Sequence, residues 1–224
     1  MANSSTAFLN AKIKEAKTLL QSRTDFPEGL RILRETRDLI LDPLDLGKKA
    51  SLYGSLFDGL TESDYHAKVN KKGRTIAYGI WHSSRIEDMT LNALVLHQAQ
   101  VFDRTMSKES VLAGVRDTGN QLDAKEIQDM SRRMDISCLI LYQRHVWSAT
   151  NAALSGLTAA DLSRKVDRND VEGLLEDGSV SRHPDATWLI DFWANKTVAG
   201  LLMMPMCRHQ IVHLNESMEA KHAR

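Results

Sequence analysis

Apolar residues recur with the helical period over almost the whole chain, and this pattern most constrains the fold. Signals of β-structure are missing, because β-branched runs are few and no Asn-Gly or Asp-Gly turn joins two alternating segments. The sequence therefore predicts an all-α protein. We expect long helices over about residues 74–102, 124–154 and 185–218, an amphipathic helix over 7–21, and a helix restarting at Asp25-Phe-Pro27.

A short internal repeat relates two parts of the chain. Residues 59–69 match residues 156–166 at a glycine, a leucine, a threonine, an aspartate, a lysine and a valine. In each copy the glycine can end an amphipathic helix, and the following Thr-x-x-Asp makes an approximate capping box for a short helix. A Thr-x5-Trp spacing then recurs at the start of the next long helix, from Thr75 to Trp81 and from Thr187 to Trp193. Two related helical hairpins are expected.

Each hairpin can bury its apolar face only by packing on the other. With 224 residues the chain can build one domain with a substantial core. We expect a four-helix bundle over residues 25–224 and an N-terminal helical extension over residues 1–24.

Composition excludes several classes of partner and location. Lys plus Arg balance Asp plus Glu at 29 each, so no net field attracts nucleic acid. The longest apolar stretch, residues 198–207, is much shorter than the roughly 20 residues that span a bilayer, and the N-terminus lacks a secretion signal. Cys138 and Cys207 carry no CxxC spacing, which fits a reducing compartment and packing roles. A cytoplasmic protein without membrane or nucleic-acid contacts is expected.

Three histidines form the candidate metal site. His82 shares a helical stripe with Tyr78, Ile86 and Met89, so its imidazole should point into the core. His209 and His213 lie one turn apart on the last helix, the spacing that two ligands to one ion require. A core histidine hydrogen-bonded to a neighbour is the plain alternative for His82, and HxxxH is common by chance.

Together the three imidazoles would leave a coordination position open to water or substrate, as in catalytic metal sites. Zinc, nickel, iron or copper would suit such a ligand set. For His82 to meet the other two, the helix that carries it must run antiparallel to the last helix. The connection over about residues 103–123 is long enough, at roughly 3.3 Å per residue, to cross the length of a bundle and allow an up-down-down-up order.

Two segments of the chain resemble the DinB/YfiT-like metalloenzyme family, and the similarity extends from about Leu30 to the end. They are Thr75-Ile-Ala-Tyr-Gly-Ile-Trp-His82-Ser-Ser-Arg85-Ile-Glu87-Asp88 and Arg208-His209-Gln-Ile-Val-His213-Leu-Asn-Glu216. The resemblance implies an up-down-down-up four-helix bundle, often dimeric, with an open metal site at His82, His209 and His213. This chain lacks the His-His-Arg-Gly-Gln-like ending that many members have on the last helix. Pro205, one turn before His209, predicts a local distortion.

The resemblance also implies a function for the open position. Characterised members include thiol S-transferases, so we expect a low-molecular-weight thiol to be transferred to an electrophilic small-molecule substrate. A metal-dependent hydrolase is the enzymatic alternative, and a non-enzymatic binding or stress-response module is the alternative from another class. Arg85 is a candidate substrate contact or, alternatively, a salt-bridge partner of Glu87, Asp88 or a residue on another helix. Glu216 is a candidate for orienting an imidazole or acting as a general base or, alternatively, a solvated carboxylate.

Overall fold

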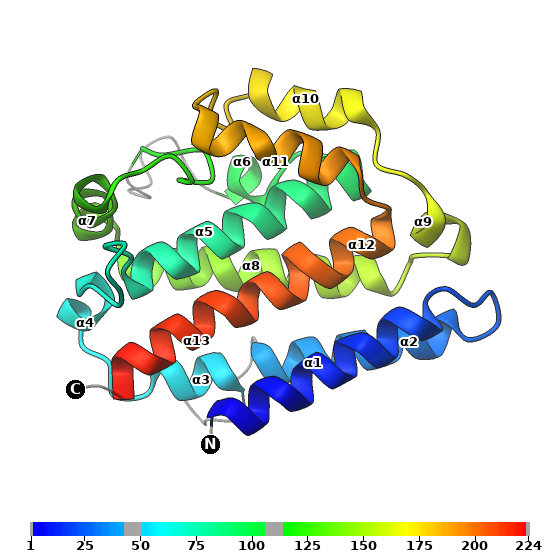
Figure 1. The fold of residues 1–224 in the computed structure, drawn as a ribbon, viewed down its shortest axis with the longest axis horizontal. Coiled ribbons are helices and arrows are strands. Elements are labelled where there is room, and N and C mark those ends of the chain that lie inside the picture. The colour runs from blue at the N-terminus through cyan, green and yellow to red at the C-terminus, as the bar shows by residue number, and fades with distance from the viewer. Residues whose placement is uncertain (1, 43–50, 106–113, 223–224) are drawn as a thin grey trace.

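The computed structural model describes residues 2–42, 51–105 and 114–222, and these residues form helices and no strands (Figure 1). The predicted all-α class is confirmed over this part of the chain. The elements are α1 (Ala2–Leu19), α2 (Phe26–Ile40), α3 (Leu52–Phe57), α4 (Glu62–His66), α5 (Ile76–Asp88), η1 (Met89–Val95), α6 (Val101–Thr105), α7 (Ala124–Arg133), α8 (Ile136–Leu154), α9 (Ala159–Ser163), α10 (Arg168–Glu176), α11 (Pro184–Ala194), α12 (Val198–Met203), η2 (Met204–Arg208) and α13 (His209–His222), where η1 and η2 are π-helical.

Helices α5 and α13 pack against each other in opposite directions, as the predicted histidine cluster requires. Just before α5 begins, Arg74 donates to Glu216, which lies in the middle of α13. Further along α5, the carbonyl of Ser83 accepts from Gln210, which lies at the start of α13. Residues later in α5 therefore contact residues earlier in α13, which means that the two helices are antiparallel.

Helix α8 lies alongside α5 and runs in the same direction. Arg85 of α5 donates to the hydroxyl of Tyr142, and Glu87 accepts from Thr150 further along α8. Helix α2 packs on α8, and α1 packs along α2. The pair α10 and α11 lies on the opposite side of the molecule from α1 and α2 (Figure 1).

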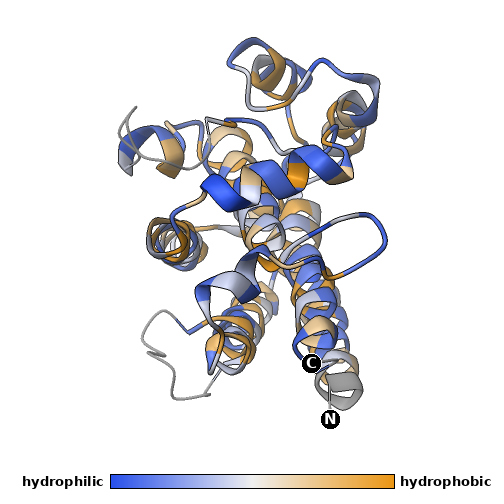
Figure 2. Ribbon diagram, turned by 90° about the vertical axis from the view of Figure 1, so that its left-hand side faces the viewer, coloured by the Kyte–Doolittle hydropathy of each residue, from blue (hydrophilic) through white to orange (hydrophobic). Residues whose placement is uncertain are grey.

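The core is built from the apolar faces of these helices, and Figure 2 shows apolar and polar residues on opposite sides of several of them. Trp81, Trp147 and Trp193 are fully buried, whereas Trp188 is 51% exposed. Within the described residues, no helix has both the length and the apolar character that crossing a bilayer requires.

All three long helices are shorter than predicted. The first ends at Val95 and is followed by the separate helix α6. The second breaks at Met134–Asp135 because Asp135 caps a new helix by accepting the backbone N–H of Cys138. The third breaks at residues 195–197, where Thr197 accepts from the backbone of Gly200. Apolar periodicity continues across such breaks, so it does not reveal them. Residues 106–113 of the predicted connection lie outside the described residues.

The internal repeat is visible in the backbone, with one correction. Both predicted capping boxes are present, at the starts of α4 and α9. Gly59 and Gly156 each directly follow the C-cap residue of a helix, as predicted. Gly59 has the left-handed conformation, with φ 73°, whereas Gly156 does not adopt a positive φ.

The correction concerns the threonine that starts the next long helix. Thr75 caps α5, and its structural counterpart is Thr197 rather than Thr187, since Lys68 bridges Thr75 as Lys165 bridges Thr197. Thr187 instead lies inside α11. The pair α10 and α11 is therefore an insertion in the second copy, placed between the short capped helix and the long one.

Candidate metal centre

His82 lies two turns into α5 and is held by one strong hydrogen bond. The helix starts at Thr75, whose side chain accepts the backbone N–H of Tyr78. The imidazole is buried, with 4% of its surface exposed, and it stacks on Tyr78. Its Nδ1 lies 2.6 Å from the carbonyl oxygen of Thr118, so Nδ1 carries the proton and donates it. The lone pair of His82 is consequently on Nε2.

His209 and His213 occupy successive turns at the start of α13. Their Nε2 atoms are 3.2 Å apart. The preceding segment η2 is π-helical and contains Pro205, so the distortion predicted from this proline is present. Gly79 lies against His213, because a Cβ added at Gly79 would be 3.6 Å from the His213 Cβ. A Cβ at that distance would be in ordinary van der Waals contact, so α5 and α13 pack closely here without requiring a glycine.

The three imidazoles meet at one point between the helices. Ring centroids are 5.0 Å apart for His82 and His209, 4.9 Å for His82 and His213, and 4.7 Å for His209 and His213. One nitrogen from each ring lies within 4.8 Å of the others. Nitrogens bound to one tetrahedral zinc ion would be about 3.4 Å apart, since each Zn–N bond is about 2.1 Å. Small side-chain rotations would therefore bring the cluster onto one ion.

The electrostatic environment keeps the rings of His82 and His209 neutral. Burial, followed by the proximity of His213, lowers the pKa of His82 to about 3. Burial and the two neighbouring imidazoles hold the pKa of His209 well below its ordinary value. Neutral imidazole is the form that binds a metal. The buried Nδ1 of His209 also has no hydrogen-bond partner among the described residues. The donor set thus fits a divalent ion.

Glu216 lies behind His213, on the side away from the cluster. Its Oε2 is 3.2 Å from the Nδ1 of His213, and both of its oxygens accept from Arg74, at 2.8 and 3.1 Å. Burial opposes ionisation of this carboxyl, but the interaction with His213 and the charge of Arg74 lower its pKa on balance. A carboxylate this close to the ring can orient a ligand histidine through a hydrogen bond, although the 3.2 Å contact here lacks hydrogen-bond geometry.

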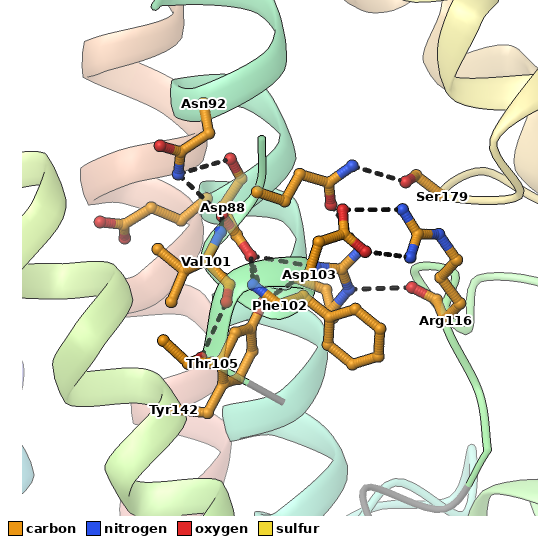
Figure 3. Close-up of polar contacts among 12 residues, drawn as sticks. Asp88, Asn92, Val101, Phe102, Asp103, Thr105, Arg116, Tyr142 and Ser179 are labelled. Carbon is orange, nitrogen blue, oxygen red and sulfur yellow. Dashed lines mark hydrogen bonds and ion pairs between the residues drawn. The ribbon is translucent and has the colours of Figure 1, made fainter. Parts of the chain in front are cut away.

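Arg85 lies elsewhere, in a buried network shown in part in Figure 3. Its guanidinium donates to Asp88, to the hydroxyl of Tyr142 and to the side chain of Gln100, and its Nε donates to the carbonyl of Arg116. Arg85 is thus a salt-bridge partner of Asp88, one of its two predicted roles, and its donors are not directed at the histidine cluster.

Asp88 connects the same network to α6 through hydrogen bonds. Its two oxygens accept the backbone N–H groups of Val101 and Phe102 at the start of that helix (Figure 3). It also accepts from Asn92 and Tyr142. These contacts are structural, because they satisfy the free N–H groups at a helix start and join α5 to α8.

Other sequence candidates lie outside the cluster. Cys207 is buried, and burial raises the pKa of its thiol to about 12, so it is a packing residue as predicted. Thr118 and Arg74, which contact the site, were not identified from the sequence. Arg74 is 142 positions from its partner Glu216, and nothing in local spacing connects them.

Comparison of the chain with protein-family models, with curated proteins and with solved structures finds no match. The geometry described above is therefore the basis for assigning a function.

Proposed function

We propose that His82, His209 and His213 bind one divalent metal ion through their Nε2 atoms. The observation that carries the proposal is the convergence of three imidazoles from two antiparallel helices, with His82 and His213 buried and His209 half-buried. Two of them are oriented from behind, His82 by the carbonyl of Thr118 and His213 by Glu216. Three protein ligands leave a position for substrate. Zinc, nickel and iron are the ions that suit this donor set.

We further propose that the chain has the DinB-like architecture. Its bundle helices would be α2, α5, α8 and the α12–α13 segment in up-down-down-up order, with α1 as the extension. The opposite directions of α5 and α13 and the shared direction of α5 and α8 support this order. A homodimer follows from the same resemblance.

For the reaction, we propose transfer of a low-molecular-weight thiol to an electrophilic substrate. A bound divalent ion would lower the pKa of the thiol and so supply the thiolate. A sulfur–carbon bond would form as the carbon–halogen bond breaks and halide leaves, or as an epoxide ring opens. The three histidines would hold the ion, and Glu216 with Arg74 would keep His213 in its binding orientation.

Thiol transfer is proposed from the resemblance, and the position of Glu216 bears on the hydrolase alternative. A protein base near the attacking water assists hydrolysis, although a bound metal ion can itself lower the pKa of that water to about 7. Glu216, the carboxylate that contacts the cluster, is bonded to Arg74 and faces Nδ1 of His213, away from the Nε2 side. It is not positioned to take a proton from a water on that side. A hydrolase and a non-enzymatic module are the competing outcomes of the tests below.

The first test is elemental analysis by mass spectrometry of the protein purified without an affinity tag. We expect close to one equivalent of metal, lost in His82→Ala, His209→Ala and His213→Ala. His145→Ala is the matched control, because His145 is exposed on α8 and should leave metal content unchanged. Folded protein that takes up no metal on reconstitution refutes the site and favours a non-enzymatic module.

The second test addresses the reaction. A visible spectrum of the cobalt-substituted protein should change on adding bacillithiol, mycothiol or glutathione, and consumption of a haloalkyl or epoxide electrophile should require both thiol and metal. If no thiol perturbs the spectrum, and ester or amide substrates are instead turned over until a chelator is added, the hydrolase alternative replaces thiol transfer.

A further inference from the structure

A second concave site, which none of the three histidines lines, lies between α1, α9 and the α12–η2 segment. We call it the α1–α12 groove. Its volume is about 1100 Å³, which is at the upper end of the range of small-molecule sites. Apolar side chains from all three elements form part of its lining, among them Ile13 of α1, Leu162 of α9 and Met203 of α12.

The charged residues of the groove all have the same sign. Five cations line it, and no aspartate or glutamate does; the cations are Lys14, Lys17, Arg23, Lys196 and Arg208. This is unexpected from composition, because the whole chain has as many acidic as basic residues. A one-signed lining on an apolar wall produces a local positive potential.

These five cations form no ion pair among the described residues, whereas acidic groups near the groove are already engaged. Glu15 of α1 pairs with Lys12, and Asp191 of α11 pairs with Arg168. Asp161 of α9 accepts from Thr158 in the capping box. Among the described residues, these carboxylates therefore do not neutralise the positive charge of the groove.

Two details show that the groove has open space and a positioned cation. The Nζ of Lys196 is 4.2 Å from the centroid of the Phe192 ring, so the ammonium rests on an aromatic face at the groove. Gly200 of α12 also lines the groove, although glycine disfavours a helix relative to alanine. A Cβ at Gly200 would meet nothing closer than the Lys196 Cβ at 3.5 Å, so packing does not require the glycine.

We infer that the α1–α12 groove binds an amphipathic organic anion, with an apolar body and one carboxylate or phosphate head. The apolar wall would take the body, and Lys196 and Arg208 would pair with the head. The site is independent of the proposed metal centre, since none of the three histidines lines the groove.

The test is isothermal titration calorimetry with decanoate and with decyl phosphate, each below its micelle concentration. Decyltrimethylammonium, which has the same chain and opposite charge, is the ligand control. We expect saturable one-to-one binding of an anion, weakened by added salt, and no binding of the cation. The better of the two anions identifies the head group.

Three variants localise the site. Lys196→Gln with Arg208→Gln should weaken binding about 3- to 30-fold, from the loss of two exposed ion pairs. Gly200→Leu should abolish binding by filling the groove while the protein keeps its thermal stability. The matched control, Lys71→Gln with Lys72→Gln, removes the same charge from two exposed residues far along the chain and should bind like the wild type. His82→Ala should also bind normally, which separates this proposal from the metal site.

Several results would overturn the inference. Equal binding of decanoate and decyltrimethylammonium would make the groove a non-specific apolar surface. Binding that survives Gly200→Leu would place the ligand elsewhere. If the protein binds vesicles of anionic lipid but neither monomeric anion, the positive face is a membrane-docking surface rather than a small-molecule site.

Discussion

Replacement of Arg37 tests how much a fully buried ion pair contributes to the stability of the core. Arg37 of α2 is fully buried and pairs with Glu87 of α5, which is also fully buried, at 2.7 Å. Its guanidinium also donates to Asn151 of α8 and to the carbonyl of Met206 in η2, and it lies 3.7 Å from the centre of the Trp147 ring. One side chain thereby joins four elements next to the histidine cluster.

The expected magnitude follows from what remains after the change. Arg37→Met leaves Glu87 with its bonds to Thr150 and Gln210 but without its countercharge. Removing one partner of a buried ion pair costs about 3–5 kcal/mol, because an uncompensated charge stays buried. Adding Glu87→Gln removes that charge, and the remaining cost should be about 1–3 kcal/mol from lost hydrogen bonds to Asn151 and Met206.

Urea unfolding followed by circular dichroism measures both values. The control is Arg34→Met, which makes the same replacement at an exposed position one turn away on α2 and should change the free energy of unfolding by less than about 0.5 kcal/mol. A loss below about 1 kcal/mol in Arg37→Met would refute the reasoning. So would a double variant no more stable than Arg37→Met alone, because the cost would then not come from buried charge.

Three further predictions concern the candidate metal centre. Glu216→Gln should weaken metal affinity about 10- to 100-fold because His213 would be less well oriented. Competition with a chelating dye measures this affinity. Gly119→Ala should lower the free energy of unfolding by about 1–2 kcal/mol in urea, because Gly119 has φ 68° and a Cβ there would lie 3.2 Å from the Tyr78 ring. In metal-free protein the pKa of His82 is about 3 rather than 6.5, so the unfolded state binds more protons between these values and stability should fall as pH drops through this range. His82→Gln should flatten that pH dependence in thermal unfolding.

Each of these has a contradicting result. Unchanged affinity in Glu216→Gln would mean that His213 is oriented by packing alone. Gly119→Ala as stable as the wild type would mean that the turn can relax at this glycine. A pH profile with the same slope in wild type and His82→Gln would assign the acid sensitivity to other groups.

Local features of the molecule could be predicted from the sequence because they depend on residues a few positions apart. The helical class follows from apolar periodicity, and the capping boxes at Thr61 and Thr158 were identified from spacing alone. The inward face of His82 and the one-turn separation of His209 and His213 follow from helix geometry in the same way.

Contacts between distant residues were decided only by the tertiary structure. The sequence suggested either a substrate contact or a salt bridge for Arg85, and in the folded protein its guanidinium bonds to Asp88 and Tyr142. The pairing of Arg74 with Glu216 and the single-signed α1–α12 groove depend on segments brought together by burial of their apolar faces. Local spacing determines which way a side chain points on its own helix. The residue that this side chain contacts depends on how the helices pack, because packing is determined by shape and burial over the whole core.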